Sequence, residues 1–159
     1  MNKTKAIFIL IISLIIQNTI FSKIDILGAN INIILPLIVA LSQILGRNFG
    51  AYSGLFSGLL EDIIFTELFG VKAMGLFLTG YFSGSNRYKN IKGGIIISFL
   101  ATIINFFLVN GIYFLLSIKS DILSYVYGPL FVEALLNTAV YVVFYKLIKK
   151  IMYLPTYRF

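Results

Sequence analysis

Six apolar runs, separated by short polar connections, account for most of this chain. Apolar runs of about 20 residues are typical of helices that cross a membrane. The first run follows a basic start and resembles a signal-peptide core, but no small-x-small cleavage pattern comes after it, so we expect a retained helix. Pro36 is expected to interrupt the second run. The pattern predicts six transmembrane helices, over residues 6–21, 31–45, 49–65, 71–84, 93–117 and 125–148.

A regular series of glycines in the third run ends at a carboxylate. Three glycines are spaced by four residues, and Asp62 is one further step of four. In a bilayer, small residues at this spacing form a flat ridge on which another helix can pack closely. Helix packing within the chain and binding of a partner are both open for this group. Its members are Gly50, Gly54, Gly58, Asp62, Gly70 and Gly80.

Charged and amide side chains also lie within or beside the predicted helices. A charged residue inside a bilayer is a functional-site hypothesis by default, and it needs a partner. The lysine at the start of the fourth helix could pair with Asp62, Glu61 or Glu133. A structural ion pair is the alternative to a functional site, and the asparagines favour hydrogen bonds between helices. This intramembrane polar group comprises Glu61, Lys72, Asn105, Glu133 and Asn137.

Composition places the chain among integral membrane proteins. Apolar residues make up 59% of it and charged residues 12%, whereas soluble domains carry roughly 25% charged residues. Cysteine and histidine are both absent, which excludes thiol chemistry and removes the commonest general base and metal ligand. No nucleophile elbow, phosphate loop or metal-ligand spacing is present. We expect one all-α transmembrane domain over residues 1–159 that is not an enzyme and uses no metal or cofactor.

The 13 basic residues are divided unequally between the two predicted sides of the membrane. Ten lie on the side that holds both termini, whereas Lys23, Lys72 and Lys119 lie on the other. Because cytoplasmic loops are enriched in lysine and arginine, both termini are predicted to be cytoplasmic. The net charge of +7 therefore reflects topology, and we expect no nucleic-acid binding. The loop from Arg87 to Lys92 could also contact anionic membrane lipids.

The order of motifs in the central stretch resembles the MreD family of rod shape-determining proteins. The shared pattern is Pro-Leu at the start of the second helix, then G-x-x-x-G-x-x-x-G-L-L-x-D, then G-x-x-A, then G-Y. Glu61 departs from this pattern, since an apolar residue is more usual there. The matching segments are Pro36-Leu37, Gly50–Asp62, Gly70–Ala73 and Gly80-Tyr81.

The resemblance implies a structural protein of the bacterial cytoplasmic (inner) membrane. Such a protein would bind MreC and help to join MreB filaments to the cell-wall elongation machinery, which includes RodA and a class B penicillin-binding protein. The resemblance also implies a six-helix bundle similar to the substrate-binding subunits of energy-coupling-factor vitamin transporters.

A subunit of such a transporter is the alternative function, with the outer polar residues as its pocket. Against it, the first helix lacks the Ala-x-x-x-Ala seam associated with docking of those subunits, and the chain has no tryptophan for an aromatic pocket. A more remote alternative is lipid transport along a groove lined by Asp62 and Glu133.

Overall fold

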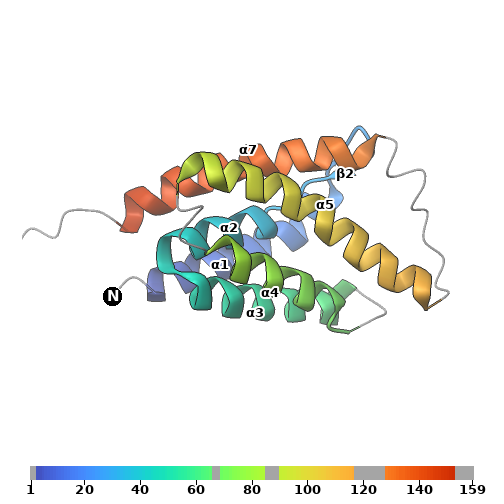
Figure 1. Ribbon diagram of the computed structural model, residues 1–159, viewed down its shortest axis with the longest axis horizontal. Coiled ribbons are helices and arrows are strands. Elements are labelled where there is room, and N and C mark those ends of the chain that lie inside the picture. Colours follow the sequence, from blue (N-terminus) through green and yellow to red (C-terminus); the bar gives the residue numbers. More distant parts are fainter. Residues whose placement is uncertain (1–2, 66–68, 85–89, 117–127, 153–159) are drawn as a thin grey trace, which may run out of the picture.

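The computed structural model describes residues 3–65, 69–84, 90–116 and 128–152. Within them the chain forms six α-helices, one short 3-10 helix and one two-stranded hairpin (Figure 1). The predicted class, a membrane protein built from α-helices, is confirmed. The helices are α1 (Lys3–Thr19), η1 (Phe21–Lys23), α2 (Ile34–Leu45), α3 (Arg47–Phe65), α4 (Val71–Ser83), α5 (Ile91–Leu115) and α7 (Pro129–Met152).

Three segments in the described residues are long and apolar enough to cross a membrane. They are Lys3–Lys23, Ile91–Leu115 and Pro129–Ile151, with 21, 25 and 23 residues. In contrast, α2 and α4 contain 12 and 13 residues. At 1.5 Å per residue each is about 18–20 Å long, which is less than the hydrocarbon thickness of about 30 Å. A topology with six complete spans therefore stays a prediction.

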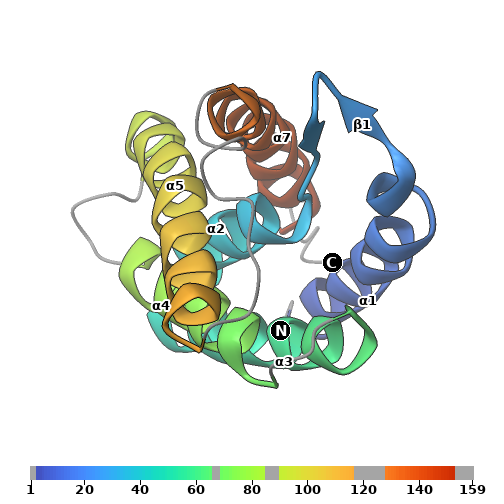
Figure 2. The same ribbon diagram turned by 90° about the vertical axis from the view of Figure 1, so that its right-hand side faces the viewer.

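Helix α2 occupies the centre of the bundle and is surrounded by the other helices (Figure 2). Its residues 34–43 are all buried. It packs against α1, α3, α4, α5 and α7, which suits a helix whose side chains are almost all apolar. The expected break at Pro36 is wrong, because this proline lies in the first turn of α2. The N–H that proline lacks has no intrahelical partner in that turn.

A β-hairpin precedes α2, and this helix begins at Ile34 rather than at residue 31. Strand β1 (Asp25–Ile26) pairs antiparallel with β2 (Ala29–Asn30). Leu27 and Gly28 connect the strands, and both have a positive φ, as in the tight two-residue turns that suit β-hairpins. The sequence predicts no secondary structure between Lys23 and the second helix, whereas the structure shows a hairpin there.

Other helix ends differ from the predicted bounds by a few residues. Helix α5 begins earlier because the side chain of Asn90 accepts a hydrogen bond from the N–H of Gly93 at 2.7 Å and caps the helix. Helix α7 begins at Pro129, a favoured position for proline. It continues through Lys149 and Lys150, since positive charge is favourable at a helix C-terminus. Residues 117 and 125–127 of the predicted helices lie outside the described residues.

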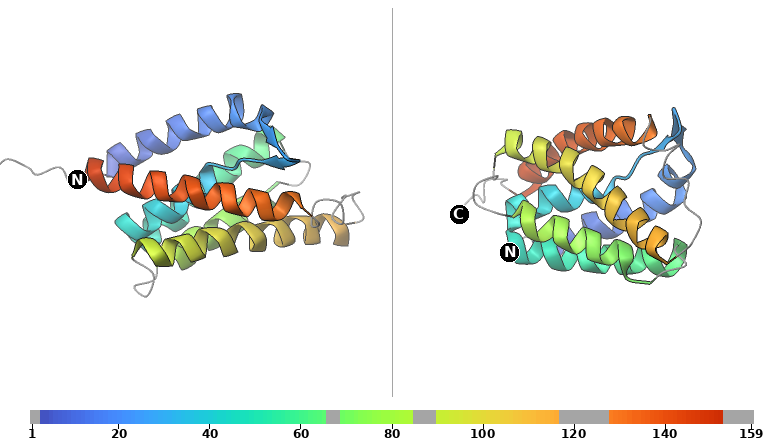
Figure 3. Two further views of the ribbon diagram at one scale, coloured as in Figure 1. Left: turned by 90° about the horizontal axis from the view of Figure 1, so that it is seen from above. Right: turned by 45° about the vertical axis from the view of Figure 1, so that its right-hand side comes forward.

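One end of the bundle carries most of the basic side chains. Helices α1, α3 and α5 begin there, and α2, α4 and α7 end there (Figures 1 and 3). The acids Glu61, Asp62 and Glu133 lie toward the opposite end, where α3 ends and α7 begins. Arg87 and Lys89 of the predicted basic loop lie outside the described residues. The basic residues described at the first end are Lys3, Lys5, Arg47, Lys92, Lys146, Lys149 and Lys150.

Candidate functional site

The glycine ridge of α3 faces another helix of the same chain. A side chain at Gly54 would collide with the backbone of Leu76, and one at Gly58 would collide with the backbone of Ala73. Both contacts are with α4, which lies beside α3 along its length (Figure 1). The missing side chains let the two helices approach closely. The ridge is therefore an internal seam of the bundle, and a role in binding a partner stays a prediction.

Three further positions fix how α2, α3 and α4 meet. Gly50 and Gly80 lie backbone to backbone. Ser42 of α2 lies beside Gly50 and donates its hydroxyl to the carbonyl of Gly80. Gly70 has a different function, because its φ of 96° is left-handed and allows the chain to turn directly before α4.

Asp62 caps the N-terminal end of α4. Its side chain is 1% exposed, and Oδ2 accepts hydrogen bonds from the N–H groups of Gly70 at 2.9 Å and Ala73 at 3.1 Å. Oδ1 accepts from the N–H of Lys72 at 3.3 Å. The first N–H groups of a helix lack intrahelical partners, and the helix dipole favours negative charge there. Asp62 therefore fastens the end of α3 to the start of α4.

Glu61 lies in different surroundings from its neighbour Asp62. Its Oε2 lies 3.7 Å from Nζ of Lys72, so this acid forms an ion pair with the lysine. The residue is 5% exposed. Among the described residues, Glu61 Oε1 is a buried side-chain atom that has no hydrogen-bond partner. Buried polar atoms are normally paired, so an unpaired carboxylate oxygen is an exception.

A cavity of about 390 Å³ lies beyond the N-terminal end of α2, and all six described α-helices contribute to its wall. The central helix is too short to fill this part of the bundle. Leu35, Leu76, Phe106 and Val109 form the main apolar part of the wall. Three charged side chains of the described residues line it, Glu61, Lys72 and Glu133. Six lining residues carry amides, and they are Gln17, Asn18, Asn30, Asn32, Asn105 and Asn110.

Side chains also hold the non-helical backbone that leads into α2. Gln17 donates from Nε2 to the carbonyl of Ile31 at 3.1 Å, and its Oε1 accepts from the N–H of Ile33 at 2.8 Å. The N–H of Asn32 donates to Oδ1 of Asn137 at 3.0 Å. The Asn32 side chain accepts from the first two N–H groups of α2 at 3.0 and 3.2 Å. Irregular backbone at membrane depth is tolerated where protein satisfies it in this way.

The two predicted asparagines connect helices. Asn105 donates to Oγ1 of Thr79 on α4 at 2.7 Å. Asn137 is fully buried and donates to Oγ1 of Thr102 on α5 at 3.2 Å. Four members of the intramembrane polar group thus meet at the cavity wall, whereas Asn137 binds residues of that wall. The four are Glu61, Lys72, Asn105 and Glu133.

The amides that precede α2 are not among the residues singled out in the sequence. Gln17 and Asn18 follow a long apolar run in α1, and Asn30 and Asn32 lie just before the apolar run of α2. An amide at the edge of a membrane-length apolar run needs a hydrogen-bond partner inside the bundle. This requirement could have identified Gln17 from the sequence. It would not have shown that the partners of Gln17 are backbone groups.

The side chains that line the cavity can form hydrogen bonds to a bound ligand. The cavity combines two carboxylates, one ammonium group and several amides, and such convergent polar groups orient a ligand in a pocket. Within residues 3–65, 69–84, 90–116 and 128–152, no group of three or more His, Cys, Asp or Glu could hold a metal ion.

The sequence model of a known family matches residues 2–151, and that family is described as rod shape-determining protein MreD. The match extends the resemblance from the central stretch to nearly the whole chain. Neither curated proteins nor solved structures give a match. Similarity to the vitamin-transporter subunits therefore stays a prediction. The chain belongs to the MreD family, whose role lies in the determination of rod shape.

Proposed function

We propose that the chain is a structural scaffold of the bacterial cell-wall elongation machinery. In this proposal it binds MreC and helps to link MreB filaments to peptidoglycan synthesis by RodA and a class B penicillin-binding protein. The observation that carries the proposal is the family match over residues 2–151. The match includes almost all of the described helices, so the whole bundle belongs to the shape-determining family.

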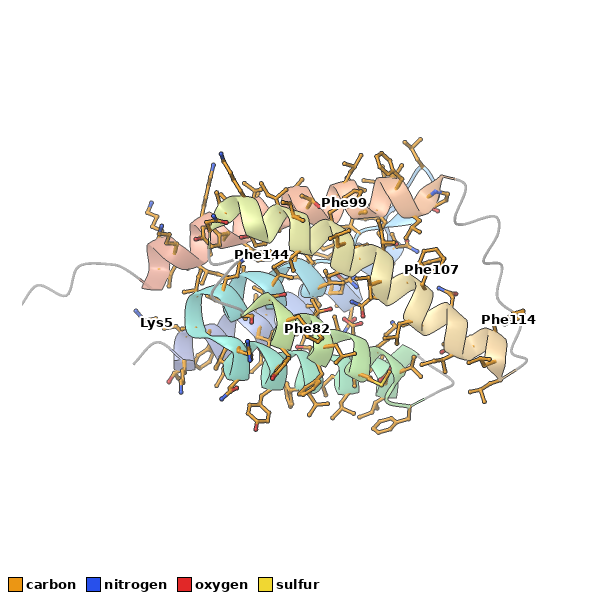
Figure 4. All side chains as sticks on the ribbon, viewed as in Figure 1. Lys5, Phe82, Phe99, Phe107, Phe114 and Phe144 are labelled. Atoms are coloured by element: carbon orange, nitrogen blue, oxygen red, sulfur yellow. The ribbon has the colours of Figure 1, made fainter. Side chains whose placement is uncertain are left out.

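The surface of the bundle is suited to contacts made within a membrane. In the membrane-length segments that contain α1, α5 and α7, only 22%, 17% and 22% of the residues in the apolar 18-residue stretch are buried inside the molecule. Large apolar side chains therefore point outward, among them Phe107 and Phe114 of α5 (Figure 4). Helices in a membrane associate through van der Waals packing of the faces that they present to lipid. We assign the contacts with MreC and RodA to the outer faces of these helices rather than to the buried ridge.

The same proposal places the chain in the cytoplasmic membrane as a multi-pass protein. Helix α1 begins and α7 ends at the same end of the bundle, which is also the basic end (Figure 1). The preference of lysine and arginine for the cytoplasmic side puts both termini in the cytoplasm. The proposed role is binding rather than catalysis, because the family is a shape-determining one.

Affinity purification from native membranes in a mild detergent tests the scaffold function. We expect MreC to co-purify with the tagged chain, together with RodA or a class B penicillin-binding protein, as identified by mass spectrometry. Recovery of a transporter's transmembrane coupling subunit and its paired ATPases in their place would contradict the proposal. That result would instead favour the vitamin-transporter alternative.

Photo-cross-linking in living cells identifies the face that binds MreC. A photoreactive residue at Phe8, Phe107 or Val143 samples the outer surface of α1, α5 or α7, where these side chains are 63%, 51% and 63% exposed. We expect a cross-linked MreC adduct from at least one of the three positions. Phe56, which is 50% exposed on α3, is the matched control outside the proposed faces. Adducts from Phe56 alone would contradict the assignment.

A further inference from the structure

We propose that the polar cavity binds a ligand that carries a primary ammonium group, which Glu61 and Glu133 hold. The ligand is either a free small molecule or a lipid head group of the same chemistry. The site lies within one chain, so the proposal does not depend on any partner protein.

The cavity has the size and rigidity of a binding site. Its volume of about 390 Å³ lies in the range of roughly 300–1,000 Å³ that small-molecule pockets occupy. Amides of the wall are fixed in place, since Gln17 bonds the backbone on both sides of Asn32 and Asn105 bonds Thr79 and the carbonyl of Ala101. A wall held in this way is formed before a ligand arrives, which reduces the ordering needed on binding.

The buried carboxylate of Glu61 is the observation that points to a ligand. Lys72 approaches Oε2 at 3.7 Å, whereas Oε1 has no hydrogen-bond partner in the part of the chain that the structure describes. A buried acceptor without a donor is unfavourable. A donor on a ligand in the cavity would satisfy this oxygen once the carboxylate of Glu61, a residue that lines the cavity, turns toward it.

Charge decides which kind of donor is preferred. In the described part of the wall, two carboxylates and one ammonium line the cavity, and this excess of carboxylates favours a cationic donor over an anion. A primary ammonium offers three N–H donors and no acceptor. Its hydrogen bonds to a carboxylate are charge-assisted and therefore stronger than neutral ones. A quaternary ammonium has the charge but no N–H, so it leaves Oε1 unpaired.

Lipids with matched acyl chains separate these two requirements. We would purify the full chain in detergent and measure binding of dioleoyl phosphatidylethanolamine and dioleoyl phosphatidylcholine by native mass spectrometry. The first carries a primary ammonium and the second a quaternary one. We expect the ethanolamine lipid to bind about tenfold more tightly, as one charge-assisted hydrogen bond would give. Equal affinities for the two lipids, together with equal affinities for their soluble glycerophospho head groups, would overturn the proposal.

Variants test whether the preference arises in the cavity. We expect Glu61→Gln and Glu133→Gln each to reduce the preference for the ethanolamine lipid. Asp25→Asn makes the same chemical change in the exposed hairpin, outside the cavity wall, and should leave the preference unchanged. A full preference in both glutamine variants would overturn the proposal. The comparison of the two lipids on the unmodified chain is informative even where a variant does not fold.

Soluble head groups distinguish the two sources of the ligand. Displacement of the bound lipid by glycerophosphoethanolamine, but not by glycerophosphocholine, would show that the site takes a free small molecule. Binding of the ethanolamine lipid without such displacement would show that it takes a lipid head group. Either result supports the ammonium site. Failure of both ethanolamine compounds to bind would overturn it.

Discussion

Single amide side chains replace the backbone hydrogen bonds that α2 lacks at its start. Gln17 bonds the backbone at Ile31 and Ile33, and Asn137 bonds the N–H of Asn32. Without these side chains, three backbone groups would lose these hydrogen bonds: the carbonyl of Ile31 and the N–H groups of Asn32 and Ile33. An unpaired backbone group in a nonpolar environment is strongly unfavourable. These amides therefore allow the chain to enter the bundle as non-helical backbone and to begin the helix only at Ile34.

Replacement of Gln17 by leucine tests this role. Gln17→Leu keeps a similar volume but removes both hydrogen bonds to the segment before α2. We expect the free energy of unfolding to fall by about 2 kcal/mol, because an acceptor and a donor lose their partner. Thermal unfolding in detergent measures the change. The control is Thr19→Val, whose hydroxyl bonds only an exposed carbonyl of its own helix. Equal stability of the two variants would argue against the role of Gln17.

The Asp62 cap gives a second prediction at single-residue scale. Asp62→Ala leaves three N–H groups at the start of α4 without this acceptor. We expect a loss of stability of about 1–2 kcal/mol, as for other helix caps. The Asp62→Asn variant retains one oxygen acceptor, so it should lose less stability than Asp62→Ala. Thermal unfolding would be compared with that of Asp25→Ala, which changes an exposed carboxylate. A cell-shape defect from Asp62→Asn at unchanged stability and protein level would point to a function beyond capping.

Helices α3 and α4 form the tightest pair in the bundle, and glycine makes their approach possible. The predicted ridge runs along the interface, with Gly54 and Gly58 against the backbone of α4. Sequence spacing identifies such a ridge, because glycines four residues apart share a helix face. It does not identify the helix that packs on the ridge. The sequence leaves packing within the chain and binding of a partner both open, and the structure shows α4 on this face.

Two alanine substitutions separate helix packing from helix propensity. At Gly54 a new side chain would meet the carbonyl of Leu76, whereas at Gly111 it would meet nothing within 4 Å. We expect Gly54→Ala to destabilise the protein by about 1–3 kcal/mol through overpacking. Gly111→Ala should stabilise α5 by about 0.5–1 kcal/mol, because alanine favours the helix. Thermal unfolding in detergent measures both. Destabilisation of equal size at the two positions would contradict the close approach at Gly54.

The helices themselves were predictable, but the position of α2 was not. Each apolar run in the sequence corresponds to a helix, because burial of apolar side chains in lipid or protein requires a satisfied backbone. Hydropathy reports the length of a run and not its depth in the bundle. Since α2 is apolar up to Ser42 and Gln43 near its end, it has no polar face along its length that would show which neighbours it contacts. The tight turn at Leu27 and Gly28 was missed because the hairpin has only two residues in each strand.

At the scale of the whole molecule, the cavity brings together residues from distant parts of the sequence. Its wall includes Gln17 and Glu133, which belong to the first and last helices. The sequence indicates that Glu61, Lys72 and Glu133 need partners, and it leaves three acids as candidates for the lysine. Only the arrangement of the helices shows that Glu61 forms an ion pair with this lysine and that Asp62, one residue later, caps the start of α4.

The distribution of charge predicts the orientation of the molecule in the membrane. The chain contains no cysteine, so single cysteines can be introduced without removing others. Lys23→Cys lies in η1, whereas Asn48→Cys and Lys150→Cys lie at the basic end, and all three positions are exposed. We expect a membrane-impermeant maleimide to label position 23 in intact cells. Positions 48 and 150 should be labelled only after permeabilisation, and the reverse pattern would contradict the predicted orientation.

The central position of α2 also has a consequence for biogenesis. Helix α2 is made early, yet the N–H of Asn32 at its start is bonded by Asn137, which is synthesised 105 residues later. Much of the surface of α2 is likewise covered by α7. The second helix therefore cannot reach its final environment until the last helix has been made, and the N–H of Asn32 needs another hydrogen-bond partner until then. The C-terminal helix thus completes the core that the N-terminal half begins.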